Sequence, residues 1–553
     1  MRDSGLNLMV FREDRRCVRG MELKAALLRD LEGLRGRVSS EQLTRSLLRA
    51  GELECAVADA DDSRSWPCPA QPIMSITDRL AEALLSPDSP TNGGELSKIV
   101  SHCSVPGEGL VTPPEGFAYY GLHPLAYAEA LNSMQPAALV AVIGIRSIGT
   151  TLSAVTAAAV RARGMKAARI TVRPAGHPYN RRMQFSPAQL ESIRRHLACG
   201  ADFLVVDEGP GLSGSSFLSV AEALVEAGAS RERIILICGH EPAFDSLCAD
   251  DGPQRARKFR WLAVSGEPRR PAEAETFIGG GQWRKLLFRE SIDWPASWTS
   301  FERLKYLSAA EGARRFFKFI GMGHYGDRVL ERESKVAAAG FGPAPSVESA
   351  GFASYPWIAG RAMSSGDLSE DAPARLAEYC AFRARTFVAE PAELNALEPM
   401  AAHNLNELGF DRVVRLRTER PVLADGRMQP HEWLLTSDGQ IFKTDSGSHG
   451  DDHFFPGATD IAWDLAGAIV EWKMDPAEAE TFLEAYRRAS GDDASSRIAD
   501  FIAAYAVFRC AYCLMAAKAM PGNEEQARLE RAAMQYRALL SHPAQQPSLA
   551  PSI

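Results

Sequence analysis

The chain has 553 residues, of which 46% are hydrophobic and 24% charged, with a net charge of -8 and a pI of about 5.9. This composition is typical of a soluble globular protein, and the length predicts two to four domains. An acidic chain without a concentrated basic stripe argues against a nucleic-acid partner. No run approaches the roughly 20 apolar residues that a membrane span needs, and no signal peptide is evident. We therefore expect a cytoplasmic protein with no nucleic-acid or membrane partner.

The ten cysteines are scattered without a repeated spacing. The only close pair is Cys510 and Cys513, which lies in an apolar helical stretch without the second pair or the histidines of a zinc site. We predict that this pair packs in a core, and the cysteine pattern fits a reducing compartment.

The first region of the chain is predicted to be helical. Residues 1–20 are charged and are expected to form a tail, and residues 21–116 to form a helical region followed by a linker. Leucines recur at helical spacing from Leu23 to Leu34, and residues 87–116 are rich in Ser, Pro and Gly. The region could cover a neighbouring active site or form an oligomer contact, so a homo-oligomer stays open.

Residues 117–265 alternate between strand and helix patterns. Short apolar runs at residues 139–145, 203–207 and 234–238 are separated by helical stretches that stop at glycines. Such alternation predicts a parallel sheet with helices on its faces. The predicted fold class is thus an α/β multidomain protein.

A phosphate-binding pattern follows the second of these runs, in residues 203–217. The apolar run ends in Asp207 and Glu208, and a Gly/Ser loop then leads directly into a predicted helix. Small residues let backbone N–H groups approach an anion, and the helix N-terminus favours negative charge. The two acids suit ribose hydroxyls or a bound Mg²⁺. The predicted phosphate-binding residues are Gly211, Ser213, Gly214, Ser215 and Ser216.

This segment resembles the ribose-phosphate signature of type I phosphoribosyltransferases, with a loop about one residue longer and serines in place of threonines. The resemblance covers residues 118–245. It implies a pyrophosphate loop with Arg146, Ser147 and Gly149, and a mobile basic loop with Arg181 and Arg182. Within that basic loop Arg173 and His177 are further candidates, and residues 238–240 would form the last contact loop. The alternatives are an empty Gly/Ser turn and a solvated basic loop.

The resemblance further implies phosphoribosyl transfer from phosphoribosyl pyrophosphate to a base-like acceptor. Mg²⁺ and Arg146 would neutralise the leaving pyrophosphate, and Asp207 and Glu208 would hold the ribose and the metal. The identity of the acceptor does not follow from the sequence.

Residues 283–540 contain a second set of ordered motifs. Lys318 lies in a short apolar run, and Glu333 follows on a predicted helix. Asp438 and Gly439 predict a hairpin turn, after which Asp445 ends the second strand. The glycines of residues 321–326 are interpreted as a turn, and residues 541–553 as a disordered tail.

This order resembles the aminoglycoside phosphotransferase and choline kinase-like kinases, and implies a bilobal α+β domain that uses ATP. Lys318 would hold the nucleotide phosphates, Glu333 would pair with Lys318, and Asp445 would bind Mg²⁺. Asp460 and Asp464 match an acidic stretch that we interpret as structural.

The catalytic loop departs from that family. Alignment on Pro430 places Arg427 where the family has its catalytic Asp, and Glu432 where it has a metal-binding Asn. Glu432 can bind a metal, whereas Arg427 cannot act as a base, so Asp425 is the substitute candidate in a reshaped loop. The nearby cluster of His449, Asp451, Asp452 and His453 is either part of the metal site or a solvated loop.

Three functions follow from these motifs. The first is a two-activity enzyme in which one domain transfers phosphoribose and the other phosphorylates a small metabolite. The second is a sensor that binds a nucleotide or phosphoribosyl pyrophosphate without turnover and has a degenerate kinase-like domain. In the third, the kinase-like domain is the only enzyme and the first domain is a scaffold.

Overall fold

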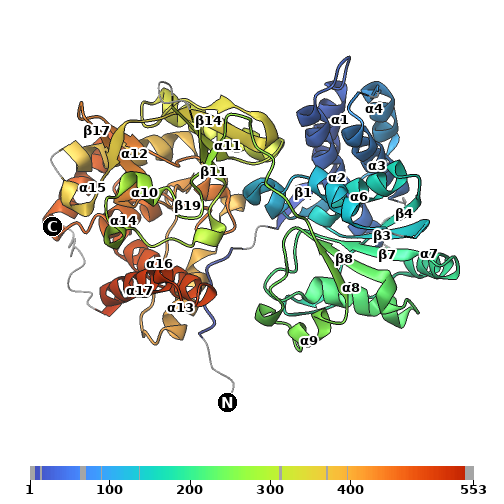
Figure 1. The fold of residues 1–553 in the computed structure, drawn as a ribbon. Helices are drawn as coiled ribbons and strands as arrows, with labels where there is room; N and C mark the ends of the chain where they lie inside the picture. Colours follow the sequence, from blue (N-terminus) through green and yellow to red (C-terminus); the bar gives the residue numbers. More distant parts are fainter. Residues whose placement is uncertain are drawn as a thin grey trace.

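The computed structural model of the protein describes residues 6–12, 15–62, 70–88, 90–135, 137–309, 314–368, 371–394 and 396–541. The chain forms two halves, one drawn mostly in blue to green in Figure 1 and the other mostly in yellow-green to red. Both helices and strands occur in each half, in agreement with the predicted mixed α/β class. The tail predicted at residues 541–553 lies almost wholly outside the described residues.

The segment before the first helix is not the predicted tail. Strand β1 (Arg16–Arg19) pairs with β2 (Glu108–Val111) in an antiparallel ladder. Upstream, Val10 is fully buried in the core of the other half, and the ring of Phe11 stacks on Phe454 at 5.0 Å. Val10 and Phe11 lie among charged residues, and two apolar residues are too few to predict a buried contact from the sequence. The segment therefore links the two halves.

Four helices follow, and they pack together on one side of the first half (Figure 1). They are α1 (Gly20–Glu32), α2 (Ser40–Asp62), α3 (Gln71–Leu85) and α4 (Gly93–His102). Helix α4 and strand β2 lie where we expected a linker. A buried ion pair attaches the helices to the sheet, because Arg169 on a strand contacts Glu54 at 2.7 Å and Asp78 at 2.7 Å.

The sheet of the first half is parallel, as predicted. Its five strands run in the order β4 (Lys166–Val172), β3 (Leu139–Ile145), β7 (Asp202–Val206), β8 (Ile234–Cys238) and β9 (Arg260–Ala263). The connections reverse direction between β3 and β7, and ligands of open α/β sheets bind at the carboxyl ends of strands beside such a switch point. The covering helices are α5 (Leu125–Ala130), α6 (Ile148–Ala162), α7 (Pro187–Ala198), α8 (Ser215–Glu226) and α9 (Gly252–Ala256). A small hairpin, β5 (Ala175–His177) and β6 (Asn180–Arg182), stands outside the sheet.

The second half begins with an antiparallel sheet and one helix. The strand order is β10 (Thr276–Phe277), β11 (Lys305–Leu307), β12 (Arg315–Phe319), β14 (Phe352–Pro356) and β13 (Ser346–Val347). Helix α11 (His324–Ala338) follows β12, after a turn in which Gly321 and Gly323 have positive φ. The turn prediction for the start of that glycine run is therefore confirmed.

The rest of the second half is mainly helical, with short strands between. Strands β15 (Gly360–Ala362), β17 (Trp433–Thr436) and β18 (Ile441–Lys443) form one sheet, and β16 (Pro421–Leu423) pairs with β19 (Ala458–Asp460). The hairpin of β17 and β18 is the one predicted from Asp438 and Gly439. The helices are α10 (Arg284–Leu287), α12 (Asp371–Thr386), α13 (Leu397–Glu407), α14 (Ala462–Glu471), α15 (Pro476–Ser490), α16 (Ile498–Ala519) and α17 (Glu524–Ser541).

Helix α16 is long and apolar enough, at 22 residues, to cross a membrane by length and composition, contrary to our expectation that no such run exists. It is 78% buried inside the protein over its most apolar window, and packs against α14 and α17. Cys510 and Cys513 are buried on it, as predicted for core residues. Burial on all sides is the behaviour of a core helix.

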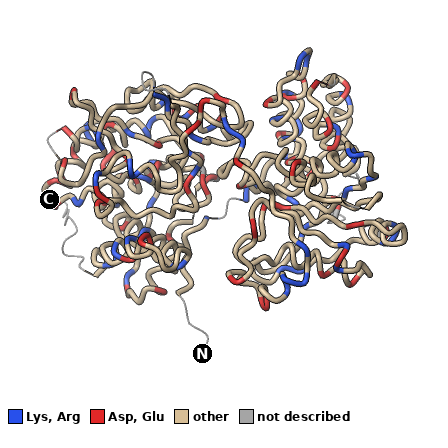
Figure 2. The backbone as a smooth tube through the Cα atoms, viewed as in Figure 1, with Lys and Arg blue, Asp and Glu red and all other residues tan. Residues whose placement is uncertain are grey.

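The two halves share an apolar contact built around a short π-helix, η1 (Gly116–Tyr120). One hydrophobic cluster contains Phe117 of this segment together with Phe319 and Phe352 of the second half. The backbone N–H of Met322 donates to the carbonyl of Phe117 at 2.9 Å. Figure 2 shows basic and acidic residues interspersed along both halves, so neither presents a field of one sign.

Candidate active site

The second half holds a buried lysine at the position that the sequence singled out. Lys318 lies on β12 and its side chain is 2% exposed. Its ammonium group contacts Asp445, donates to the hydroxyl of Ser448 at 2.7 Å, and lies 3.5 Å from Glu333. The predicted pairing of Lys318 with Glu333 is present, and the hydroxyl of Tyr355 donates to Glu333 on its other side.

Asp445 follows β18 and is surrounded by cations. Besides Lys318, its carboxylate lies 3.4 Å from Lys305 and 3.4 Å from His449. Burial favours the neutral acid, but Lys318, His449 and Lys305 together hold the pKa of Asp445 well below its ordinary value. The residue has a φ of 53°, in the left-handed region that a non-glycine residue seldom adopts. Asp445 is therefore held ionised in a strained turn at the centre of the site.

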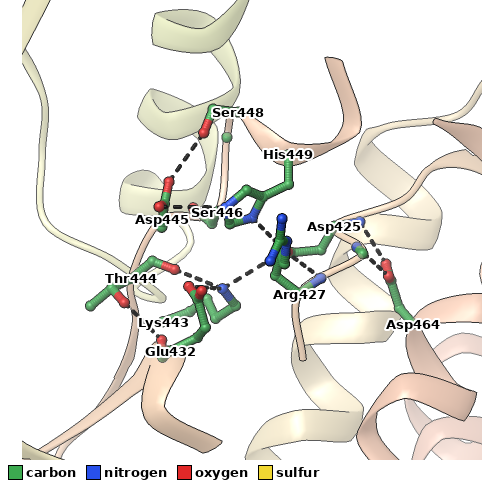
Figure 3. Close-up of polar contacts among 12 residues, drawn as sticks. Asp425, Arg427, Glu432, Lys443, Thr444, Asp445, Ser446, Ser448, His449 and Asp464 are labelled. Carbon is green, nitrogen blue, oxygen red and sulfur yellow. Dashed lines mark hydrogen bonds and ion pairs between the residues drawn. The ribbon is translucent and has the colours of Figure 1, made fainter. Parts of the chain in front are cut away.

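Three possible metal-binding side chains come together here. One ligand atom each of Glu432, Asp445 and His449 lies within 4.8 Å of the others. Figure 3 shows these side chains with their polar contacts. Two hydrogen bonds connect the segments, since Thr444 donates its backbone N–H (2.8 Å) and its hydroxyl (3.0 Å) to the carbonyl of Glu432. The predicted metal pair of Glu432 and Asp445 is thus brought together. Carboxylate oxygens are the protein ligands that Mg²⁺ prefers, so these two acids fit it.

His449 is better explained as a link between two acids than as a ligand of Mg²⁺. Its ring nitrogens lie 3.5 Å from Asp425 and 3.4 Å from Asp445. Burial opposes a charge on the ring, but the two carboxylates raise the pKa of His449 above its ordinary value. Of the remaining predicted cluster, Asp452 accepts the backbone N–H of Phe454 at 3.0 Å, and the side chain of Asp451 lies outside the described residues.

Asp425, the substitute candidate for the base, lies behind His449 and lines neither of the cavities described below. It is fully buried, and its carboxylate lies 3.6 Å from Lys443 and 3.7 Å from Arg383. These cations hold its pKa below the ordinary value, although burial alone would raise it. Asp464 accepts the backbone N–H groups of Asp425 and of the following glycine at 2.9 and 2.8 Å, as expected for a structural acid. Asp425 is therefore placed as an internal counter-ion.

Two cavities meet at this cluster. The first has a volume of about 160 Å³ and opens onto Lys318, Glu333 and Asp445. Its remaining wall is largely apolar and includes Ile278, Leu286, Phe316, Pro356, Trp357 and Leu434. The second, of about 90 Å³, is lined by more polar residues, among them Tyr119 and Tyr120 of the first half. Both cavities include Lys305, Glu432 and Asp445 in their walls.

Sequence reasoning missed two of these cations. Lys305 stands directly opposite Lys318 in the ladder between β11 and β12, and Lys443 ends strand β18. A lysine in a short β-run gives no sign of its cross-strand neighbour, so only the register of the sheet could have revealed the pair.

In the first half, the predicted acid pair lies at the switch point. Asp207 and Glu208 follow β7 and are only partly exposed. Burial raises the pKa of Asp207 to about 7 and, with help from the charge of Glu115, that of Glu208 to about 8. The hydroxyl of Tyr127 donates to the backbone carbonyl of Asp207 at 2.6 Å, so this hydrogen bond does not involve the carboxylate of Asp207. Among the described residues neither acid forms an ion pair of the kind that holds Asp445, although Arg173 and Arg181 act on Asp207 from farther away.

The predicted phosphate loop forms, but its hydroxyls contact the protein. Gly211 and Gly214 have positive φ, and α8 begins at Ser215. The hydroxyls of Ser213 and Ser215 donate to the carbonyl of Pro178, at 2.8 and 2.6 Å. Pro178 belongs to the turn of the predicted mobile loop, which therefore folds down on the phosphate loop. In that loop Arg181 donates to the carbonyl of Pro174 at 3.3 Å, and Arg182 makes no ion pair with a described residue. Ser216 lies in the first turn of α8.

The predicted pyrophosphate loop is placed differently from expectation. Arg146 is 6% exposed and lies 3.0 Å from Asp59 of α2, and Arg173 lies 2.6 Å from the same acid. Both arginines thus face α2 in this structure. Ser147 has a φ of 98°, and its hydroxyl donates to the carbonyl of Thr112 at 3.2 Å. A strained residue at the end of a strand is common at ligand sites, but it is not evidence of one.

Gly149 lies where the predicted loop meets the acid pair. A Cβ atom there would stand 2.6 Å from the backbone oxygen of Val206 and 3.5 Å from Asp207. Only glycine fits at that distance. The loop after β3 and the acids after β7 are therefore adjacent.

No protein-family model and no curated protein matches the chain. Similar solved structures include a choline/ethanolamine kinase family protein from Mesorhizobium loti, with 17% identity over 44% of this chain and 87% of that one, and a TM-score of 0.33. Choline kinase LicA from Streptococcus pneumoniae has 15% identity over 42% of this chain and 89% of its own, with a TM-score of 0.29. A spectinomycin phosphotransferase in complex with ADP and spectinomycin has 13% identity over 45% and 90%, with a TM-score of 0.33.

These matches concern less than half of the chain and are kinases or phosphotransferases by description. At such identities and TM-scores they assign neither family nor activity to the chain. They give no support to the phosphoribosyltransferase resemblance of residues 118–245.

Proposed function

We propose that the second half binds ATP with Mg²⁺ and transfers its terminal phosphoryl group to a small molecule. The observation that carries this proposal is the buried Lys318, which joins an apolar cavity to the acids Asp445 and Glu432. An apolar slot next to fixed cations and metal-binding acids is what a nucleotide requires, because its base is flat and apolar and its phosphates are anionic.

The division of labour follows from the two cavities. The base of the nucleotide occupies the larger cavity, between Ile278 and Trp357 among others, and its phosphates lie against Lys318 and Lys305. Asp445 and Glu432 hold the metal, which neutralises charge on the transferring group when bound. The acceptor enters from the smaller cavity, so donor and acceptor meet at the side chains that both cavities share.

Formation of ADP distinguishes an enzyme from the alternative, a nucleotide sensor without turnover. The proposal predicts Mg²⁺-dependent ADP formation that falls by at least about 100-fold in Asp445→Asn, because that carboxylate is placed on the metal. Lys335→Met is the matched control, since Lys335 is an exposed lysine of α11. Nucleotide binding without any ADP formation would leave only the sensor.

A second site is proposed at the carboxyl ends of β3 and β7, for a ribose phosphate such as phosphoribosyl pyrophosphate. It is supported by the switch point, the contact of Gly149 with the end of β7, and the acids Asp207 and Glu208, neither of which forms an ion pair with a described residue. In this proposal Mg²⁺ or ribose hydroxyls meet the acids. The turn at Pro178 lifts to free Ser213 and Ser215 for the phosphate.

The test is thermal unfolding with Mg²⁺ and phosphoribosyl pyrophosphate. A ligand at about 100 times its dissociation constant adds roughly 2.7 kcal/mol to the stability of the part that binds it. The proposal predicts that phosphoribosyl pyrophosphate raises the Tm of the parent and does not change the Tm of Asp207→Asn. If the parent Tm does not move, the site is not a ribose-phosphate site.

A further inference from the structure

The smaller cavity of the second half contains a guanidinium group that makes no ion pair with a described acid. Arg427 lines this cavity and is only partly exposed. Its Cζ atom lies 5.6 Å from the ring centre of Tyr512, and within the described part of the chain no carboxylate lies within ion-pair distance of it. Figure 3 places Arg427 beside Asp425 and His449, at the centre of the candidate active site.

The surroundings contain charges of both signs, since Asp452 and Glu432 attract the guanidinium of Arg427 from beyond ion-pair distance and Arg509 repels it. Arg509 lies over the same Tyr512 ring at 5.0 Å, so two guanidinium groups flank one aromatic side chain. Arg509 has an acid, Glu471, at 3.5 Å, whereas Arg427 has no described acid within ion-pair distance. A third arginine of the cavity, Arg303, has a buried Nη2 atom without a hydrogen-bond partner. Buried charges and polar groups without partners are costly unless a ligand completes them.

The acids that line the cavity already have donors or cations of the protein. Asp452 accepts the backbone N–H of Phe454 at 3.0 Å, and Glu432 of the proposed metal site lies 3.4 Å from Lys443. Glu302 accepts the hydroxyl of Ser297 at 2.6 Å, the indole N–H of Trp283 at 3.2 Å and a backbone N–H at 2.9 Å. Asp445 faces Lys318 and Lys305. A guanidinium group without a described acid at ion-pair distance, beside a buried Arg303 Nη2 atom without a described partner, favours an anionic ligand in the cavity.

We infer that this cavity binds a small molecule through a carboxylate or phosphate group on Arg427, and that an oxygen of this anion is the phosphoryl acceptor. The inference rests on the proposed function and names its acceptor class. It also gives a chemical reason for the arginine in the catalytic loop, where the kinase-like pattern has its Asp. A hydroxyl acceptor must lose a proton, whereas an anionic oxygen at neutral pH has none to lose, so a base is not required and a cation that orients the anion is.

The step is balanced without a further reagent. The anionic oxygen attacks the γ-phosphorus of ATP, a new O–P bond forms, and the bond from that phosphorus to the β,γ-bridging oxygen breaks. The electron pair leaves with ADP. The product is an acyl phosphate from a carboxylate, or a phosphoanhydride from a phosphate.

The test uses acetate and inorganic phosphate as probes, with acetamide and ribose as uncharged controls, on the full chain with Mg²⁺ and ATP. We expect one of the anions, and neither control, to raise the rate of ADP formation. In Arg427→Met that stimulation is lost by at least roughly tenfold, while the Kd of ATP is unchanged; Arg427→Lys, which keeps the charge, restores part of it. Arg488→Met, at an exposed position of α15, is the matched control and behaves as the parent.

The product distinguishes the two anions. Hydroxylamine converts an acyl phosphate to a hydroxamate and leaves a phosphoanhydride intact. If ATP binds but neither anion stimulates the parent, or if Arg427→Met responds as the parent does, the inference is wrong while the proposed function stands. If ATP does not bind the parent, the proposed function itself fails.

Discussion

The acid pair at the end of β7 makes the most quantitative prediction about stability. Burial raises the pKa of Asp207 from 3.8 to about 7, a difference of a little over three pH units. Each unit corresponds to about 1.4 kcal/mol of free energy between the protonated and the ionised form. Ionising this carboxylate would then disfavour the folded state by on the order of 4 kcal/mol. Because the group is partly exposed, water screens part of that effect, and we expect about 2 kcal/mol.

The sign follows from proton binding. Between about pH 4 and pH 7 the folded protein holds a proton on Asp207 that the unfolded chain has lost, so stability falls as the pH rises through this window. Asp207→Asn removes the ionisation. The free energy of unfolding of the variant, minus that of the parent, should therefore be larger at pH 8.5 than at pH 5.

The assay is urea unfolding of both proteins at the two pH values, with EDTA to remove divalent metals. The expected gain is about 1.3 kcal/mol in the free energy of unfolding, because the range from pH 5 to the folded pKa of about 7 covers roughly two thirds of the window. Mg²⁺ added at pH 8.5 should stabilise the parent more than the variant, if the acids bind it. An equal difference between the two proteins at both pH values would refute the reasoning.

Two further predictions concern the attachment of the N-terminal region. Arg169→Met leaves Glu54 buried without its cation, so unfolding by urea should show a loss on the order of 3 to 5 kcal/mol, and a loss below about 1 kcal/mol would contradict the buried pair. Val10→Ala removes two methyl groups from the core of the second half, and a loss of about 1 to 2 kcal/mol is expected in the same assay. If residues 6–12 were a free tail, Val10→Ala would change nothing.

Local patterns predicted the elements well where the pattern was long. The parallel sheet, the loop after β3 and the acids after β7 were predicted from apolar runs that end in glycines and acids. Such runs mark both the strand and its carboxyl end within a few residues of sequence. The hairpin at Asp438 and Gly439 and the lysine of β12 were predicted on the same grounds. The pairing of Lys318 with Glu333 came from a resemblance and is present in the structure.

Contacts between distant segments were beyond that reasoning. Asp59 draws Arg146 and Arg173 toward α2, and neither the acid nor the helix is near them in sequence. Arg427 has no described acid within ion-pair distance, and a sequence does not record such a spatial relation. In each case long-range geometry decides which charges meet, and with it which side chains are left for a ligand.

The central claim is tested most directly by calorimetric titration of ATP into the full chain with Mg²⁺ present. The account predicts one nucleotide bound per chain, with a Kd weakened at least roughly tenfold in Lys318→Met and unchanged in Lys335→Met. A parent that binds no nucleotide, or a Lys318→Met variant that binds it as tightly as the parent, would contradict the claim.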